Sequence, residues 1–171
     1  MAKAVFCIAK SEGQAVSIIN QLREAGFSND DVSVLLPDCA GTRDFAHEQH
    51  TKAPEGAATG AVAGGIAAGV LGWLVGVGSL AIPGVGPLIA AGPIMAALSG
   101  AAAGGAVGGM AGALVGFGIP EYEAKQYQGK VKDGNILISV HADDSKERNA
   151  AKEIFERSHA SDISYTGEAR A

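Results

Sequence analysis

The amino-acid sequence predicts an α+β protein in which a long uncharged segment interrupts a domain made of two similar halves. The first observation is that a strand, a helix and a second strand are predicted near each end of the chain. The second is that residues 56–120 contain no Asp, Glu, Lys or Arg. The 171 residues are enough for one domain with a core of its own and an insertion.

The first half lies within residues 1–54, which end in a linker. The stretch "KAVFCIA" predicts a strand because it is rich in β-forming residues and is bounded by charge. Ser11, with Gln14 three residues later, predicts the capped start of a helix whose apolar residues follow at helical spacing. The stretch "DVSVLLP" predicts a second strand that ends at Pro37.

The second half lies within residues 120–171 and repeats this order after a short helix. "NILISVH" predicts a strand, Asp144 with Glu147 marks a helix start, and "DISYTG" predicts a final strand. Together the halves give the βαβ–βαβ order of a ferredoxin-like domain. Because each half is too small to bury a core alone, we expect one four-stranded sheet covered by two helices. In that sheet residues 120–171 complete one domain with residues 1–37.

Residues 55–119 are expected to form a helical hairpin inserted between the second and third strands. If both halves share a sheet, the two ends of the insertion must return to the same side of the domain. The outgoing helix is predicted over Gly56–Ile82 and the returning helix over Pro93–Phe117. The stretch "AIPGVGP" predicts the hairpin turn. The expected turn residues are Pro83, Gly84, Gly86 and Pro87.

A small residue recurs at every fourth position along both predicted helices. Residues four apart lie on one helix face, so each helix would present a groove for close packing of the small-xxx-small type. Each glycine costs about 1 kcal/mol relative to alanine in an exposed helix. The pattern therefore predicts a helix-packing interface that recovers this cost. Its glycines are Gly56, Gly60, Gly64, Gly72, Gly76, Gly100, Gly104, Gly108, Gly112 and Gly116.

The surroundings of this glycine zipper have two interpretations. The predicted helices exceed the ~30 Å hydrocarbon core of a bilayer and lack charge, which favours insertion in a membrane with both termini in the cytoplasm. Trp73, Tyr122 and Tyr127 would then be interfacial anchors. However, "LSGAAAGGAVGGMAGA" is mostly Ala and Gly. The alternative is therefore a water-soluble cytoplasmic assembly, such as a filament, tube or shell, whose core consists of the hairpins.

The composition limits the other classes of function. A net charge of −5 and 5% aromatic residues argue against nucleic acid as a partner. His47 and His50 are weak candidates for a metal site because their spacing is one residue short of the zincin pattern and no third ligand is evident. Cys7 is expected in the core, and Cys39 is expected to be exposed and reduced. We expect no cofactor and no catalytic group, and hence a non-enzymatic protein whose main partner is itself.

Five stretches carry a resemblance to a known family: "KAVFCIAKSEGQAVSIINQLREAGF", "KAPEGAATGAVAGG", "LAIPGVGPLIAAGPI", "GFGIPEYEAKQY" and "GNILISVHADD". The chain resembles bacterial general-stress or low-temperature-induced glycine-zipper proteins over about residues 3–165. The resemblance implies a bacterial source, stress-linked expression and membrane association, and it implies no catalytic residues. A third interpretation is that the chain is a small subunit of a larger membrane complex.

Overall fold

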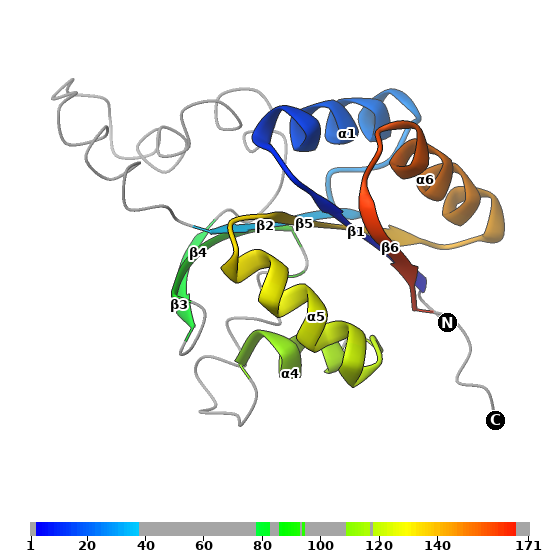
Figure 1. Cartoon of the computed structure of the whole chain (residues 1–171). Coiled ribbons are helices and arrows are strands. Elements are labelled where there is room, and N and C mark those ends of the chain that lie inside the picture. The colour runs from blue at the N-terminus through cyan, green and yellow to red at the C-terminus, as the bar shows by residue number, and fades with distance from the viewer. Residues whose placement is uncertain are drawn as a thin grey trace, which may run out of the picture.

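The computed structural model describes residues 3–37, 78–82, 86–92, 94, 109–116 and 118–166. These ranges contain helices and strands, so the α+β class predicted from the sequence is confirmed (Figure 1). In chain order the described elements are β1 (Lys3–Ala9), α1 (Glu12–Glu24), β2 (Val32–Pro37), β3 (Gly78–Ile82), β4 (Gly86–Ala91), α4 (Gly109–Gly116), α5 (Glu121–Lys132), β5 (Ile136–Ala142), α6 (Ser145–Arg157) and β6 (Ser161–Tyr165).

The strands of the two halves lie side by side in one sheet. Among the described residues the sheet has six strands in the order β3-β4-β2-β5-β1-β6, and all neighbouring strands are antiparallel. The four strands predicted from the sequence are β1, β2, β5 and β6, and they occupy adjacent places. The two halves therefore share a sheet, as expected, but β3 and β4 widen it beyond the four predicted strands.

The middle of the insertion corrects the predicted helical hairpin. Residues 78–82, expected at the end of the outgoing helix, form β3, and residues 86–91 form β4. Ile82 pairs with Gly86, so the chain reverses at the Pro- and Gly-rich stretch but between two strands. Gly86 and Pro87 begin β4, while Pro83 and Gly84 lie outside the described residues. Pairing with β2 gives the backbone of β4 partners that helical spacing in the sequence does not reveal.

The returning helix of that prediction is described only in part. Ile94 is helical, and α4 covers residues 109–116. Within the described ranges, no helix combines the length and the hydropathy that crossing a bilayer requires.

Helices cover both faces of the sheet (Figure 1). On β1, Val5, Cys7 and Ala9 point into one core, while Phe6 and Ile8 point into the other. This alternation is the period of two that a strand imposes on its side chains. Strands β1, β2 and β5 are largely apolar because neither of their faces is left to solvent.

The first core lies beneath α1 and α6, which pack on the same face of the sheet. Their buried residues are Ala15, Ile18, Ile19 and Leu22 on α1, with Ala151, Ile154 and Phe155 on α6. Helical spacing in the sequence predicts these positions together with Ala25 and Ser158, but Ala25 is exposed and Ser158 is half-buried. The two-helix layer expected from the sequence is present.

The second core lies on the opposite face, beneath α4 and α5. Met110 and Leu114 of α4, together with Tyr127 and Val131 of α5, are buried there against Phe6 and its neighbours on the sheet. The sequence predicts only one helical layer, so this third layer is an addition. It joins the exit of the insertion, through α4 and α5, to the sheet.

Each described helix ends at a residue in the left-handed region. These residues are Gly26, Gly118, Gly134 and His159, with φ values of 93°, 89°, 100° and 55°. In each case the next backbone N–H donates to the carbonyl five residues earlier, as Phe27 does to Leu22 and Ala160 does to Phe155. His159 takes in the second half the place that Gly26 takes in the first.

Gly92 carries the chain out of β4 and past β2. It has φ +85°, and a Cβ built on it would lie 2.3 Å from the carbonyl oxygen of Val32 and 2.9 Å from the Cα of Ser33. Two residues later the backbone N–H of Ile94 donates to the Oγ of Ser33 at 3.2 Å. The position therefore requires glycine twice, for its φ and for the close approach of two backbones.

Candidate functional site

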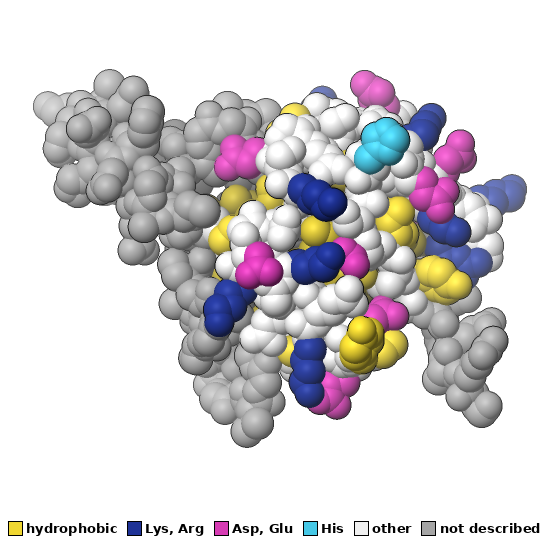
Figure 2. Space-filling view, viewed as in Figure 1, with side chains coloured by type: hydrophobic (Ala, Val, Ile, Leu, Met, Phe, Trp, Pro, Cys, Tyr) yellow, Lys and Arg dark blue, Asp and Glu magenta, His cyan; other side chains and the backbone are white. Residues whose placement is uncertain are grey.

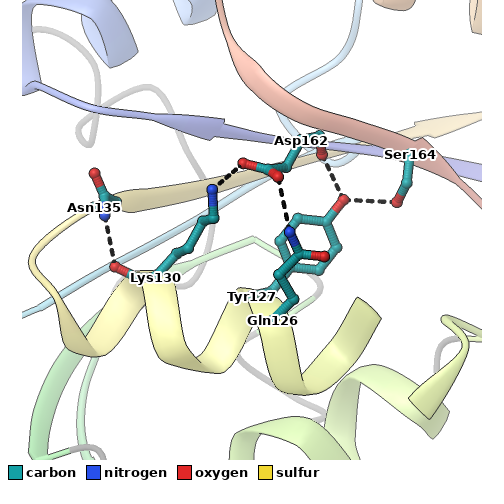
Figure 3. Close-up of polar contacts among 6 residues, drawn as sticks. All are labelled: Gln126, Tyr127, Lys130, Asn135, Asp162 and Ser164. Carbon is teal, nitrogen blue, oxygen red and sulfur yellow. Dashed lines mark hydrogen bonds and ion pairs between the residues drawn. The ribbon is translucent and has the colours of Figure 1, made fainter. Parts of the chain in front are cut away.

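The most connected polar group among the described residues joins α5 to β6. It consists of Gln126, Tyr127 and Lys130 on α5 with Asp162 and Ser164 on β6, and we call it the α5–β6 cluster (Figure 3). Its two sides lie more than 30 residues apart in the chain, so the antiparallel sheet and the helix crossing it bring them together.

A β-bulge on β6 positions Asp162. Phe6 pairs with Ser164 and Ile8 with Ser161, so Asp162 and Ile163 together face Cys7 alone. Asp162 has φ +50°, a conformation that aspartate adopts more readily than most residues. The bulge turns the Asp162 carboxylate and carbonyl toward α5 rather than along the regular ladder (Figure 3).

Tyr127 lies at the boundary between the second core and this cluster. Its ring packs near that of Phe6 with centroids 6.2 Å apart, while its hydroxyl donates to the carbonyl oxygen of Asp162 at 2.6 Å. Because the single phenol proton is used there, the Ser164 hydroxyl, also at 2.6 Å, donates to the Tyr127 oxygen. Burial raises the pKa of Tyr127 above its ordinary value, and the hydrogen bond with Ser164 opposes part of that rise.

The carboxylate of Asp162 binds both neighbouring polar residues of α5. The Nε2 of Gln126 donates to its Oδ1 at 3.0 Å, and the Nζ of Lys130 donates to its Oδ2. The Lys130 and Asp162 side chains are 34% and 22% exposed, so water screens the pair less than it screens an ion pair on the open surface. At the end of α5, the Nδ2 of Asn135 donates to the carbonyl of Lys130 (Figure 3).

These contacts suit the cluster to holding elements together rather than to reacting. The Tyr127 phenol has a raised pKa and keeps its proton at neutral pH, and the Lys130 ammonium is paired with a carboxylate. The groups face one another across two elements, and each satisfies a polar atom of its neighbour. The cluster fastens α5, which follows the insertion, to the C-terminal strand of the sheet.

Replacing Tyr127 by Phe is expected to destabilise the fold by about 1–2 kcal/mol, because the Asp162 carbonyl loses its donor. The raised pKa of Tyr127 also makes the stability of the fold depend on pH. The protonated phenol stabilises the fold fully below the unfolded-state pKa of about 10, and this contribution is lost as pH rises above it. Urea unfolding at neutral and alkaline pH measures both effects.

The matched control is Tyr122→Phe, because Tyr122 is 79% exposed on the same helix. It should leave both the stability and its pH dependence unchanged. Equal behaviour of the two variants would contradict the role given to the Tyr127 hydroxyl.

Similar caps begin the helices of both halves. Ser11 accepts from the Gln14 N–H and the Gln14 Oε1 accepts from the Lys10 N–H, at 3.2 and 2.7 Å. Asp144 accepts from the Glu147 N–H and the Glu147 Oε2 accepts from the Asp143 N–H, both at 2.8 Å. Both predicted helix starts are therefore confirmed.

The side chain of Gln14 also joins the two halves. Its Nε2 donates to the carbonyls of Ser158 and His159, each at 2.8 Å. The start of α1 is thereby bound to the end of α6.

The residues predicted for metal or thiol chemistry do not meet in a site. Cys7 is buried as expected, and burial raises the pKa of its thiol, which disfavours the reactive thiolate. His47, His50 and Cys39 lie outside the described residues. Among the residues that are described, no three His, Cys, Asp or Glu side chains come together as metal ligands.

Most of the glycine zipper also lies outside the described ranges. Gly112 and Gly116 are described, and both are exposed on α4. A Cβ added at Gly116 would meet no atom within 4 Å. Of the predicted aromatic anchors, Tyr127 is instead buried and hydrogen bonded, Tyr122 is exposed, and Trp73 is not described.

The α5–β6 cluster cannot be predicted from the sequence, although two residue patterns in the sequence belong to it. Tyr127 and Lys130 are three residues apart and so share a helix face, and Asp162 is a poor strand former within "DISYTG". Neither observation identifies the partner. The contact depends on the bulge and on the placement of α5 across the sheet.

The visible face of the molecule carries both signs of charge, with basic and acidic side chains interspersed over the described elements (Figure 2).

No family model, no curated protein and no solved structure matches this chain.

Proposed function

We propose that this chain is a non-enzymatic, stress-associated structural protein of bacteria that self-associates through its glycine zipper. In this proposal the α+β domain fixes the ends of the glycine-rich insertion, and the insertion makes the contacts between subunits. The bacterial source and the link to stress rest on the resemblance given above. The self-association rests on the glycine register and on the geometry of α4.

The orientation of α4 is the observation that carries the proposal. Met110 and Leu114 are buried in the second core, whereas Gly112 and Gly116 are exposed together with Val115, which is 41% exposed. The glycine face is therefore the face that the domain's own core leaves unused. Because residues four apart share a helix face, a helical continuation toward Gly108 and Gly104 would extend the same face.

We further propose that the domain is ferredoxin-like. The four strands of the two halves lie in the order β2-β5-β1-β6 with antiparallel pairing. Both intervening helices, α1 and α6, cover the same face. This arrangement agrees with two βαβ units that interlock in one sheet. On this basis β3 and β4 are an extension of the sheet contributed by the insertion.

The position of β3 and β4 favours a water-soluble assembly as the form of this protein. A membrane hairpin would reverse direction on the far side of a ~30 Å hydrocarbon core. Here the chain reverses beside β2, within the domain's own sheet. The inner membrane remains the second proposal, because residues 56–77 lack charge and include the strongly apolar stretch "IAAGVLGWLVGV".

Replacing Gly104 and Gly108 together by Leu tests the self-association. The variant should dissociate because two leucines would fill the groove that close packing needs. Ala102→Leu with Ala106→Leu is the control, since it also places two leucines at the same spacing but on another helix face. Light scattering after size-exclusion chromatography measures the assembly. Unchanged oligomers in the glycine variant, or equal dissociation in both variants, would sink the proposal.

Cell fractionation distinguishes a water-soluble assembly from a protein of the inner membrane. Soluble particles formed without detergent support the assembly, whereas recovery in a carbonate-washed membrane pellet supports the inner membrane. Recovery with unrelated chains at fixed ratios would support a subunit of a larger membrane complex.

A further inference from the structure

The two edges of the sheet differ in how they are protected. An edge strand offers unpaired backbone N–H and C=O groups to another chain, and natural proteins block this with bulges, charges or proline. Here β6 forms one edge and β3 the other, at opposite ends of the sheet (Figure 1).

The β6 edge carries several of these protections. The bulge interrupts its register, and Asp162 adopts φ +50° in the middle of the strand. The Asp162 side chain is held to α5, which fixes the irregular backbone in place. At its end, the ring of Tyr165 packs under the guanidinium of Arg148, 5.8 Å from the ring centroid. This edge is poorly suited to pairing with another strand.

The described residues of the β3 edge include no bulge, no charged side chain and no proline. The strand "GSLAI" contains no charged residue and no proline, and its pairing with β4 is unbroken from Gly78 to Ile82. Among the described strands, β3 pairs with β4 alone. It therefore presents a regular and uncharged edge of five residues.

Proline in β4 indicates which backbone groups face outward. Antiparallel strands alternate between pairs that exchange hydrogen bonds and pairs that do not. Ala81 pairs with Pro87, which has no N–H, so this is a pair that does not exchange them. Leu80 then bonds toward β4, and Ser79 and Ala81 direct their N–H and C=O groups away from β4.

We propose that the β3 edge pairs with the β3 edge of a second copy of this chain. In the two-fold, antiparallel arrangement Ser79 exchanges hydrogen bonds with the partner's Ala81, and Leu80 lies opposite the partner's Leu80. A two-fold axis places identical residues near one another, so a charged edge would repel itself, whereas this edge carries no charge. The contact is separate from the glycine zipper and joins two six-stranded sheets into one.

Cross-linking at the two-fold axis tests this pairing directly. In antiparallel sheets the pairs without hydrogen bonds have Cα atoms about 4.5 Å apart, which a disulfide can span. We expect Leu80→Cys, made in a Cys39→Ser chain and treated with a mild thiol oxidant, to give a covalent dimer as its main product. Tyr165→Cys is the matched control, because Tyr165 is exposed on the protected β6 edge. Absence of the Leu80→Cys dimer, or an equal yield from Tyr165→Cys, overturns the proposal.

A second variant removes the pairing instead of trapping it. Ala81→Pro deletes an outward N–H and leaves the bonds toward β4 intact, since proline is tolerated at edge positions whose N–H faces solvent. Two hydrogen bonds are lost per dimer, so pairing should weaken about tenfold or more by sedimentation velocity. The Leu80→Cys dimer should also persist when Gly104 and Gly108 are replaced by Leu. If the cross-link is lost in that combined variant, edge pairing depends on the glycine zipper, and the proposal of a separate contact is wrong.

Discussion

Replacing Gly92 by Ala is expected to lower the free energy of unfolding by about 3 kcal/mol or more. Two costs add at this position. Alanine is strained at φ +85°, and its Cβ would overlap the Val32 carbonyl oxygen at 2.3 Å. The atoms in the way belong to the backbone of β2, in the middle of the sheet, so they cannot move aside as a flexible side chain would. Thermal and urea unfolding of the full chain measure the loss.

Gly134→Ala separates the two costs. Gly134 has φ +100°, but a Cβ added to it would meet nothing within 4 Å. This variant should therefore lose only the conformational part, about 1 kcal/mol. If Gly92→Ala lowers the free energy of unfolding no more than Gly134→Ala does, then Gly92 does not lie as close to the backbone of β2 as described.

Replacing Asp162 by Ala should cost about 2–3 kcal/mol, because it removes three contributions at once. The Lys130 ammonium loses its counter-charge, Gln126 loses an acceptor, and alanine is less stable than aspartate at φ +50°. Unfolding by urea is the measurement, and hydrogen exchange of α5 should accelerate because the cluster fastens that helix to β6.

Two further substitutions divide this loss into its parts. Asp162→Gly keeps the left-handed conformation and removes the carboxylate, so it should cost about 1 kcal/mol less than Asp162→Ala. Asp162→Asn keeps the acceptor for Gln126 and tolerates the conformation, so it should cost least. The expected order of destabilisation is Ala, Gly, Asn. A different order would show that the bulge and the carboxylate do not contribute as described.

Local patterns were reliable where a segment's own residues decide its conformation. The starts of α1 and α6 were predicted because Ser11 with Gln14, and Asp144 with Glu147, bind backbone groups a few residues away. Strands β1, β2 and β5 were predicted because their β-forming residues fill two buried faces. The shared sheet followed from the small size of each half.

The insertion shows where such patterns fail. Glycine and alanine at every fourth position predict a helix through residue 82, yet residues 78–82 form β3. Those residues have little intrinsic preference for helix or strand, so their conformation depends on the available hydrogen-bond partners. The backbone of β2 provides partners for β4, and the backbone of β4 provides partners for β3. The sequence contains no pattern that predicts the pairing of β4 with the edge of β2.

The sequence by itself determined the α+β class, the two matched halves with their helix caps, and the uncharged glycine-rich segment between them. These follow from local propensity, from apolar spacing and from composition. Only the tertiary structure decided that β3 and β4 extend the sheet, that α4 and α5 cover its second face, and that Asp162 meets Lys130. Each of these depends on contacts between residues far apart in the chain, whose energies become available only after the sheet has formed.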